Sequence, residues 1–206
     1  MKKQRCSVVG NSPIILSSTY GNQIDSYDVV IRCNKAPTQG LEEHTGARTT
    51  IRFLNGVVAR LLTTPEASYQ NPQFNNNFSN WKSLRLEDVL KDEHIILKDD
   101  NPTVQEVSAV VAGKHEVTGI TPSYFEKLKK LSNSSNPTAG FCAVVWASET
   151  FETVDCYGFD FYEKAQEGDT KLHYYEEVYN FKGYEWHNFQ KEREVLSSLT
   201  NVTFHY

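Results

Sequence analysis

Apolar and polar positions near the start of the chain predict a strand, a helix and a second strand. Residues 7–10 have the length and the valine content of a buried strand, and they lead directly into Ser12 and Pro13. Serine is a good helix N-cap and proline fits the first helical position, so we predict a helix that begins at Pro13. We expect it to end near Gly21, because glycine can adopt the left-handed cap conformation. The apolar run 29–32 then completes a βαβ unit, which favours a parallel sheet.

An asparagine follows each of the first three predicted strands. Asn11 follows the first strand, Asn34 the second, and Asn55 a third strand at 49–53. Open α/β sheets bind their ligands at the carboxyl ends of the strands, so we expect these side chains at a ligand-binding edge. An amide offers donors and an acceptor, which suits a sugar hydroxyl or the edge of a base.

The rest of the chain continues this alternation of strands and helices. The segment 69–81 is polar and nearly aperiodic, which predicts a surface insertion, either simply solvated or at the border of a substrate cleft. A helix is expected to begin at Thr121-Pro122, with one apolar stripe and with its lysines facing water. We further predict strands at 95–97, 154–159 and 202–204, and an amphipathic helix that opens at Trp186-His187.

The loop 132–140 ends at the N-terminus of another predicted helix. Thr138, Ala139 and Gly140 offer a hydroxyl, backbone N–H groups and a residue without a side chain. Together these suit an anion or a closely packed ribose. An ordinary helix cap is the alternative interpretation.

Composition narrows the class of protein. The 206 residues suit one α/β domain, and a net charge of −5 with scattered basic residues argues against nucleic acid as a partner. No apolar run approaches the roughly 20 residues that cross a bilayer, and no signal-peptide core precedes the first strand. The four cysteines have no CxxC spacing, which predicts buried free thiols and no cysteine zinc site.

Four segments, taken in order, resemble the motifs of the eukaryotic-type sialyltransferase family. Residues 6–50 are similar to its large motif, through Gly-Asn-Ser at 10–12, the run 28–38, and Gly46 followed by Thr49-Thr50. Residues 137–159 are similar to its small motif. The segment His173-Tyr174-Tyr175 is similar to its third motif, and His187 with Glu192 is similar to its very small motif.

The resemblance implies a fold and an activity for a single domain over residues 1–206. The implied fold is α/β and modified Rossmann-like, a glycosyltransferase A-type variant with a mostly parallel sheet and helices on both faces. The implied activity is inverting and metal-independent and uses no cofactor. It moves sialic acid from CMP-sialic acid to a hydroxyl of a glycan acceptor that ends in galactose or sialic acid.

The resemblance also implies roles for individual residues. His187 would be the general base, and His173 would bind the donor phosphate. The other residues that would hold the donor are Asn11, Ser12, Asn34, Thr138, Ala139, Gly140, Phe159 and Tyr174.

The predicted chemistry needs a base for the acceptor hydroxyl and donor groups around the phosphate. A histidine at a helix N-terminus stays neutral because the helix dipole lowers its pKa, and His187 is expected at such a position. Glu192 lies five residues further on, off the face of His187 on a helix, so we expect it to cap or to form a salt bridge. The remaining histidines are expected at the surface: His44, His94, His115 and His205.

Three features depart from the family pattern. Pro13 replaces the usual glycine, which the first helical position tolerates. Phe151 occupies the position of the cysteine that would pair with Cys6, so Cys6 is predicted to be a free thiol unless Cys142 reaches it. The N-terminal membrane anchor of the family is missing. The last two features favour a reducing compartment, so we expect a soluble cytoplasmic protein, or a Golgi-lumenal one if the chain is trimmed.

Three alternatives remain open at this stage. The donor could carry another CMP-linked keto sugar acid such as Kdo. The protein could be a non-catalytic CMP-binding relative. It could also be a hydrolase in which His173, His187 and an acidic residue bind a metal, although their spacing is neither HxxxH nor HExxH. A dinucleotide enzyme or a P-loop protein is disfavoured, because neither GxGxxG nor a Walker motif is present.

Overall fold

The computed structural model describes residues 4–63, 90–99, 102–111, 113–161, 171–175 and 186–206. The insertion predicted at 69–81 lies outside the described residues.

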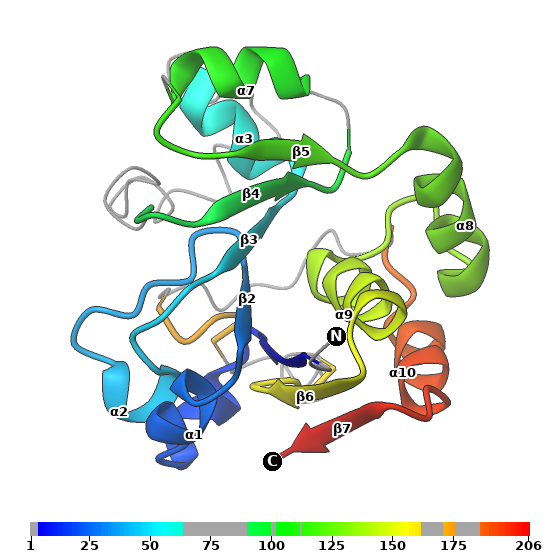
Figure 1. The fold of residues 1–206 in the computed structure, drawn as a ribbon. Helices are drawn as coiled ribbons and strands as arrows, with labels where there is room; N and C mark the ends of the chain where they lie inside the picture. Colours follow the sequence, from blue (N-terminus) through cyan, green and yellow to red (C-terminus); the bar gives the residue numbers. More distant parts are fainter. Residues whose placement is uncertain (1–3, 64–89, 100–101, 112, 162–170, 176–185) are drawn as a thin grey trace.

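One sheet organises the fold, and every pair of neighbouring strands in it is parallel (Figure 1). The strand order is β5-β4-β3-β2-β1-β6-β7. This confirms the predicted α/β class and the parallel pairing of the first two strands. The strands are β1 (Arg5–Val9), β2 (Val29–Cys33), β3 (Ile51–Leu54), β4 (His94–Leu97), β5 (Val117–Gly119), β6 (Thr153–Tyr157) and β7 (Val202–His205).

Helices cover both faces of the sheet, as predicted. Figure 1 shows α8, α9 and α10 grouped on one side, and α1 with α2 on the other. The described helices are the 3₁₀ helix η1 (Pro13–Ser17), α1 (Gly21–Asp25), α2 (Glu42–Thr45), α3 (Gly56–Thr63), α7 (Val104–Val110), α8 (Pro122–Ser132), α9 (Ala139–Thr150) and α10 (Phe189–Ser197).

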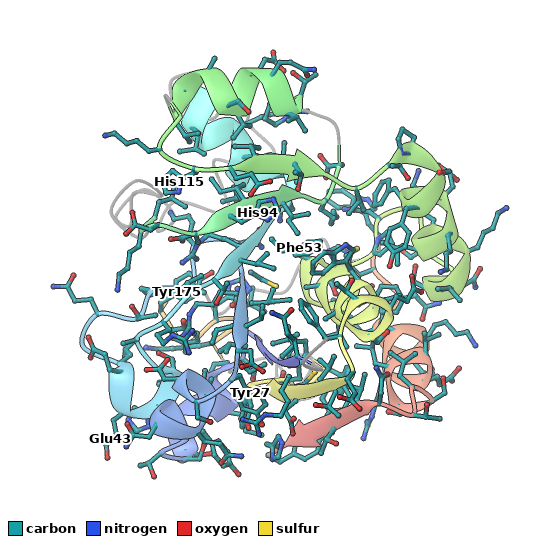
Figure 2. All side chains as sticks on the ribbon, in the orientation of Figure 1. Tyr27, Glu43, Phe53, His94, His115 and Tyr175 are labelled. Atoms are coloured by element: carbon teal, nitrogen blue, oxygen red, sulfur yellow. The ribbon has the colours of Figure 1, made fainter. Side chains whose placement is uncertain are left out.

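Alternate residues of the central strands enter different hydrophobic cores. In β2, Ile31 joins the core that α8, α9 and α10 close, whereas Val30 joins a second core with Ile15 of η1 and Ile24 of α1. A third core joins α3 and α7 to β3 and β4. Side chains therefore fill both sides of the sheet (Figure 2), and this burial on both faces explains why the strands read as continuous apolar runs.

The first helix differs from the prediction at its end. Ser12 caps it by accepting a hydrogen bond from the Ile14 N–H, and Pro13 takes the first position, as expected. The helix ends at Ser17, however, and Gly21 begins α1. A Cβ at Gly21 would lie 1.9 Å from the carbonyl oxygen of Glu42, so this glycine is needed for close contact with α2 and not for a helix cap.

The order of the strands reverses at β1. The chain passes from β1 to β2 on one side, and β6 pairs with β1 on the other. Beyond the strand ends, the Gly10 N–H donates to the Tyr157 carbonyl (2.7 Å) and the Ser12 N–H to the Gly158 carbonyl (3.1 Å). Such a switch point is where open α/β sheets hold their ligands.

The four cysteines are buried free thiols, as predicted: Cys6, Cys33, Cys142 and Cys156. Burial raises the pKa of each thiol, that of Cys33 to about 12. Phe151 packs its ring against that of Trp146 at a centroid distance of 5.9 Å. Among the described helices, none has the length and apolar character needed to span a membrane.

Candidate functional site

Asn11 lies at the carboxyl end of β1 and holds neighbouring segments together. Its Nδ2 donates to the carbonyl of Cys33 (3.4 Å) and to the hydroxyl of Tyr175 (3.2 Å). Its Oδ1 is buried and has no hydrogen-bond partner within the described part of the chain. Since a buried acceptor without a partner is costly, this oxygen is suited to receive a hydrogen bond from a bound ligand.

Asn34 follows β2 in the left-handed region, with φ at 54°. Its Oδ1 accepts from the Asn55 N–H (3.0 Å), and its carbonyl accepts from Nη1 of Arg52 (2.8 Å). These contacts use the oxygens of Asn34 and leave its Nδ2 as the group that can donate to a ligand.

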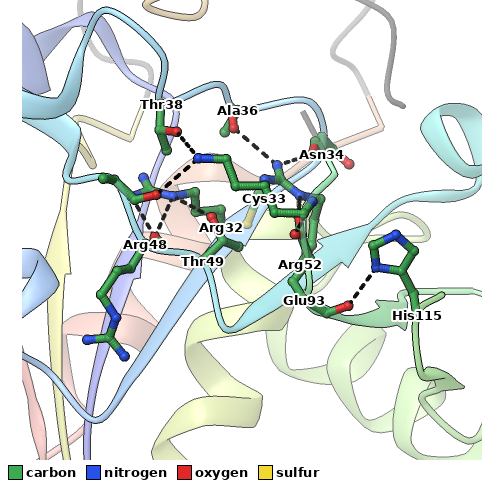
Figure 3. Close-up of polar contacts among 12 residues, drawn as sticks. Arg32, Cys33, Asn34, Ala36, Thr38, Arg48, Thr49, Arg52, Glu93 and His115 are labelled. Atoms are coloured by element: carbon green, nitrogen blue, oxygen red, sulfur yellow. Dashed lines mark hydrogen bonds and ion pairs between the residues drawn. The ribbon is translucent and has the colours of Figure 1, made fainter. Parts of the chain in front are cut away.

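Arg52 anchors the loop that carries Asn34 (Figure 3). Besides the Asn34 carbonyl, its Nη1 reaches the carbonyl of Ala36 (3.1 Å). Its Nε pairs with Glu93 at 2.7 Å, and both side chains are essentially fully buried. A buried pair of this kind is strongly destabilised when one partner is removed, so the loop is firmly held.

The segment 171–175 lies against the same edge. The Tyr174 N–H donates to the Asn11 carbonyl (2.9 Å), and the Tyr174 hydroxyl donates to the Pro37 carbonyl (2.7 Å). The His173 ring stacks on that of Tyr175, with centroids 5.4 Å apart. Burial raises the pKa of Tyr174 to about 12, and its hydroxyl hydrogen is already engaged. Tyr175, whose hydroxyl lies beside Asn11, is therefore the better placed tyrosine for a ligand.

Thr138 is the N-cap of α9. Its Oγ1 accepts from the Phe141 N–H (3.0 Å), as in an ordinary helix cap. Ala139 and Gly140 fill the first two helical positions, whose N–H groups have no acceptor within the helix. A Cβ at Gly140 would lie 3.1 Å from the ring of Phe159, so the glycine lets that ring approach. Donors of the helix N-terminus and an aromatic ring thus meet at the switch point.

Glu192 of α10 binds this cap from the other side. Its carboxylate accepts from the Thr138 N–H (2.8 Å) and from the Thr138 hydroxyl (2.6 Å). Burial raises the pKa of Glu192 to about 7, although both bonds and the charge of Lys98 oppose the shift. Of the two expected roles, a cap or a salt bridge, Glu192 takes a form of the first, because it binds the N-cap residue of α9 and so links α9 to α10.

His187 lies just before α10, whose N-cap is Asn188, so the helix begins later than predicted. Nδ1 of His187 donates to the carbonyl of Asn136. Because a carbonyl only accepts, the neutral ring carries its hydrogen on Nδ1 and its lone pair on Nε2. Burial, the largest cause, and the charge of Lys98 lower the pKa of His187 to about 4, against the raising effect of the hydrogen bond to Asn136.

The contacts of the described residues divide the predicted site residues into two groups. Asn11 and Asn34 lie with the segment 171–175, and Thr138 lies with Glu192. Ser12 is buried and caps η1. Phe159 packs edge-to-face against Phe204, with ring centroids 5.8 Å apart.

Four histidines expected at the surface are instead half-buried and hydrogen-bonded. Figure 2 labels two of them, His94 and His115. These histidines lie outside the family motifs and were therefore expected at the surface. Hydrogen-bond partners on other segments of the fold keep them partly buried instead. The pairs are His44 with the Ser18 carbonyl (2.6 Å), His94 with Thr118 (2.8 Å), His115 with the Glu93 carbonyl (3.0 Å) and His205 with Asp155 (2.6 Å).

Sequence reasoning missed three polar residues of the site. Asn136 and Arg52 carry no local signal, because their partners are distant in the chain. Lys98 does carry one, since it directly follows β4 as Asn34 and Asn55 follow their strands. In the part of the chain that the structure describes, no three His, Cys, Asp or Glu side chains gather as a metal site requires, so the metal-hydrolase alternative has no ligand set there.

Comparisons with known proteins agree on one family. The family model described as glycosyltransferase family 29 (sialyltransferase) matches residues 1–203. A CMP-N-acetylneuraminate-beta-1,4-galactoside alpha-2,3-sialyltransferase of Rattus norvegicus is 26% identical over 97% of this chain and 56% of its own length. A CMP-N-acetylneuraminate-beta-galactosamide-alpha-2,3-sialyltransferase 4 of Mus musculus is 29% identical over 85% and 55%. The chain thus spans about half the length of these curated relatives.

Solved structures share the fold. A mammalian sialyltransferase crystallised with Gal-beta-1-3GalNAc-ortho-nitrophenol matches with a TM-score of 0.65 and 24% identity, over 100% of this chain and 70% of that one. The sialyltransferase CstII from Campylobacter jejuni, in complex with cytidine-5'-monophosphate, matches with a TM-score of 0.54 and 14% identity, over 98% and 79%.

Proposed function

Because this chain belongs to glycosyltransferase family 29, the sialyltransferases, we propose that it transfers sialic acid from CMP-sialic acid to a hydroxyl of a glycan acceptor. The proposed reaction inverts the anomeric carbon and needs no metal ion. The acceptor ends in galactose, in keeping with the galactoside and galactosamide in the names of its relatives.

The observation that carries the proposal is the hydrogen bond from Nδ1 of His187 to the Asn136 carbonyl. It leaves the lone pair on Nε2, where a general base needs it. Pro137, the residue after Asn136, leads into the N-terminus of α9, and the N–H groups there suit the phosphate of the donor.

In the proposed mechanism, a single displacement joins the acceptor oxygen to the anomeric carbon of sialic acid. As that bond forms, the bond from the carbon to the phosphate oxygen of CMP breaks, and the hydroxyl proton passes to Nε2 of His187. The products are the sialylated glycan and CMP. His173 and the first N–H groups of α9 stabilise the charge that grows on the phosphate.

Donor contacts in this proposal come from both groups of residues. Oδ1 of Asn11, which has no partner among the described residues, accepts from the nucleotide, and Nδ2 of Asn34 donates to it. Thr138 acts by shaping the turn, because its hydroxyl is engaged with Glu192. The ring of Phe159 and the missing side chain of Gly140 shape the space between them.

The test combines binding and transfer. CMP should raise the melting temperature, whereas UMP and GMP should not. Incubation with CMP-sialic acid and glycans ending in galactose, N-acetylgalactosamine or sialic acid, read by mass spectrometry, should give product with the galactose acceptors, and EDTA should not reduce it. His187→Ala should lower transfer by about 100-fold or more and leave CMP binding intact.

His44→Ala is the matched control. His44 lies on α2, and its Nδ1 also forms a hydrogen bond with a backbone carbonyl, that of Ser18. It should transfer like the unmodified protein. Full activity of His187→Ala would reject the base assignment, and equal stabilisation by UMP would reject the donor. Transfer of Kdo from CMP-Kdo in place of sialic acid would replace the sugar assignment.

A further inference from the structure

A buried lysine contacts the turn that holds the proposed base. Lys98 directly follows β4, and its backbone N–H donates to the Leu54 carbonyl (2.8 Å), which extends the pairing of β4 with β3. Its side chain is only 3% exposed. Lysine is rarely buried to this degree without partners for its charge, so the contacts of its ammonium group indicate its purpose.

The Lys98 ammonium binds the turn that precedes α9. Nζ donates to Oδ1 of Asn136 (2.6 Å) and to the carbonyl of Pro137 (2.8 Å), and it lies 5.7 Å from the centre of the Phe125 ring. Both acceptors are uncharged. The buried ammonium therefore holds the turn through hydrogen bonds and forms no salt bridge with these two groups.

The same turn holds His187. Asn136 receives Lys98 on its side chain and His187 on its backbone carbonyl. Its N–H donates to the hydroxyl of Ser134 (3.1 Å), and that hydroxyl donates to the Trp186 carbonyl. Asn136 thus connects the buried ammonium to the ring of His187 and, through Ser134, to the backbone just before it.

We propose that Lys98 is a positioning residue for His187, holding the Asn136–Pro137 turn so that the Asn136 carbonyl fixes the Nδ1–H and the direction of Nε2. The catalytic consequence rests on the proposed function, in which His187 is the base. The effect on the ring itself does not depend on any activity.

Electrostatics supports this role. Among the described residues, Glu192 on α10 and the thiol of Cys142 on α9 interact with the charge of Lys98, and Asp99 and the thiol of Cys33 act on Cys142. The positive charge of Lys98 lowers the pKa of His187, in the same direction as burial. Removal of the ammonium should therefore raise this pKa. It should also free the ring to change tautomer, and this second effect separates a positioning lysine from one that acts only through its charge.

The test is Lys98→Met, which keeps most of the length of the side chain and removes its donors and charge. In ¹⁵N-histidine NMR spectra, the pKa of His187 should rise and the fraction of the Nδ1–H tautomer should fall. In transfer assays, kcat should fall by about 10- to 100-fold, because the base is misplaced. KM for CMP-sialic acid should change by less than about twofold, since the donor contacts remain.

Lys127→Met is the matched control. Lys127 lies on α8, pairs with Glu149 at 2.7 Å and is about half exposed, so its loss should change neither the spectra nor kcat. Asn136→Ala is the second variant, because it removes only the side-chain acceptor and keeps the carbonyl that His187 uses. It should lower the fraction of the Nδ1–H tautomer, as Lys98→Met does, whereas the pKa of His187 should not rise, because the charge of Lys98 remains.

Each outcome decides a separate question. An unchanged tautomer, pKa and kcat in Lys98→Met would overturn the positioning role. If Lys98→Met does not fold, an unchanged His187 spectrum in Asn136→Ala overturns it instead. If the unmodified protein transfers nothing, the proposed function fails, while the NMR titrations still decide whether Lys98 controls His187.

Discussion

The imidazole of His187 donates Nδ1–H to the carbonyl of Asn136 and is half-buried. A charged ring is disfavoured in this place, so the pKa falls to about 4. The neutral ring predicted from the sequence is therefore expected at physiological pH. Its principal cause is burial, whereas the sequence suggested the dipole of α10, which begins only beyond the Asn188 cap.

This pKa predicts the acid limb of the transfer reaction. A base with a pKa of about 4 stays deprotonated through the weakly acidic range, so kcat/KM should hold down to about pH 5 and fall only near pH 4. The measurement is a pH–rate profile at low CMP-sialic acid. A limb near pH 6.5, the usual value for histidine, would contradict the buried base.

Folding has to be followed in the same range. The folded pKa of His187 lies below that of the unfolded chain, so its contribution to stability is present above about pH 6.5 and is lost as pH falls toward 4. Circular dichroism at each pH separates loss of the base from loss of the fold. A fall in rate counts as titration of His187 only where the spectrum is unchanged.

At the scale of elements, α9 and α10 are linked by one carboxyl group. Glu192 accepts from both the N–H and the hydroxyl of Thr138, and burial raises its pKa to about 7. A raised carboxyl pKa means that the folded protein favours the protonated form. The contribution of Glu192 to stability is therefore complete below about pH 4.5 and is lost as pH rises through about 7.

Glu192→Gln should remove this dependence, because an amide stays neutral and can still accept from the Thr138 N–H. The free energy of unfolding of the variant minus that of the unmodified protein should become more positive as pH rises from 4.5 to 7.5. Urea unfolding at several pH values measures it. His187 titrates in both proteins and cancels from the difference, so parallel curves would contradict the raised pKa of Glu192.

Local signals in the sequence predicted the elements where the cause is itself local. Thr121 caps α8 and Pro122 opens it, as expected, because a cap needs only residues within one turn. Gly21 was misinterpreted, since the reason for its missing side chain is the Glu42 carbonyl on another helix. The half-buried histidines were missed for the same reason, because their hydrogen-bond partners are 22 to 50 residues away.

At the scale of the whole molecule, the sequence predicted the parallel sheet, and the polar side chains that follow β2 and β3, but not the strand order. The ligand edge stays a prediction. Strand pairs follow from βαβ units, whereas the return of β6 to the free side of β1 depends on packing across the whole chain. The contacts around the proposed base could not be predicted from the sequence for the same reason. Asn136 lies 38 residues from Lys98 and 51 from His187, and no periodicity spans such distances.

The switch point between β1 and β6 yields the last prediction. A Cβ at Gly10 would lie 2.3 Å from the Gly158 carbonyl oxygen and 2.9 Å from the ring of Phe159, so Gly10→Ala must push the ends of β1 and β6 apart. Overpacking of this kind costs about 1–3 kcal/mol in the free energy of unfolding. Because Asn11 and Phe159 border the same crossing, CMP affinity should fall by more than the stability loss alone explains, measured by calorimetry at a temperature where the variant is folded.

Gly119→Ala on β5 is the control, since its nearest atom is a Val104 methyl at 3.1 Å that can move. Unchanged CMP affinity in folded Gly10→Ala would place the donor away from the switch point.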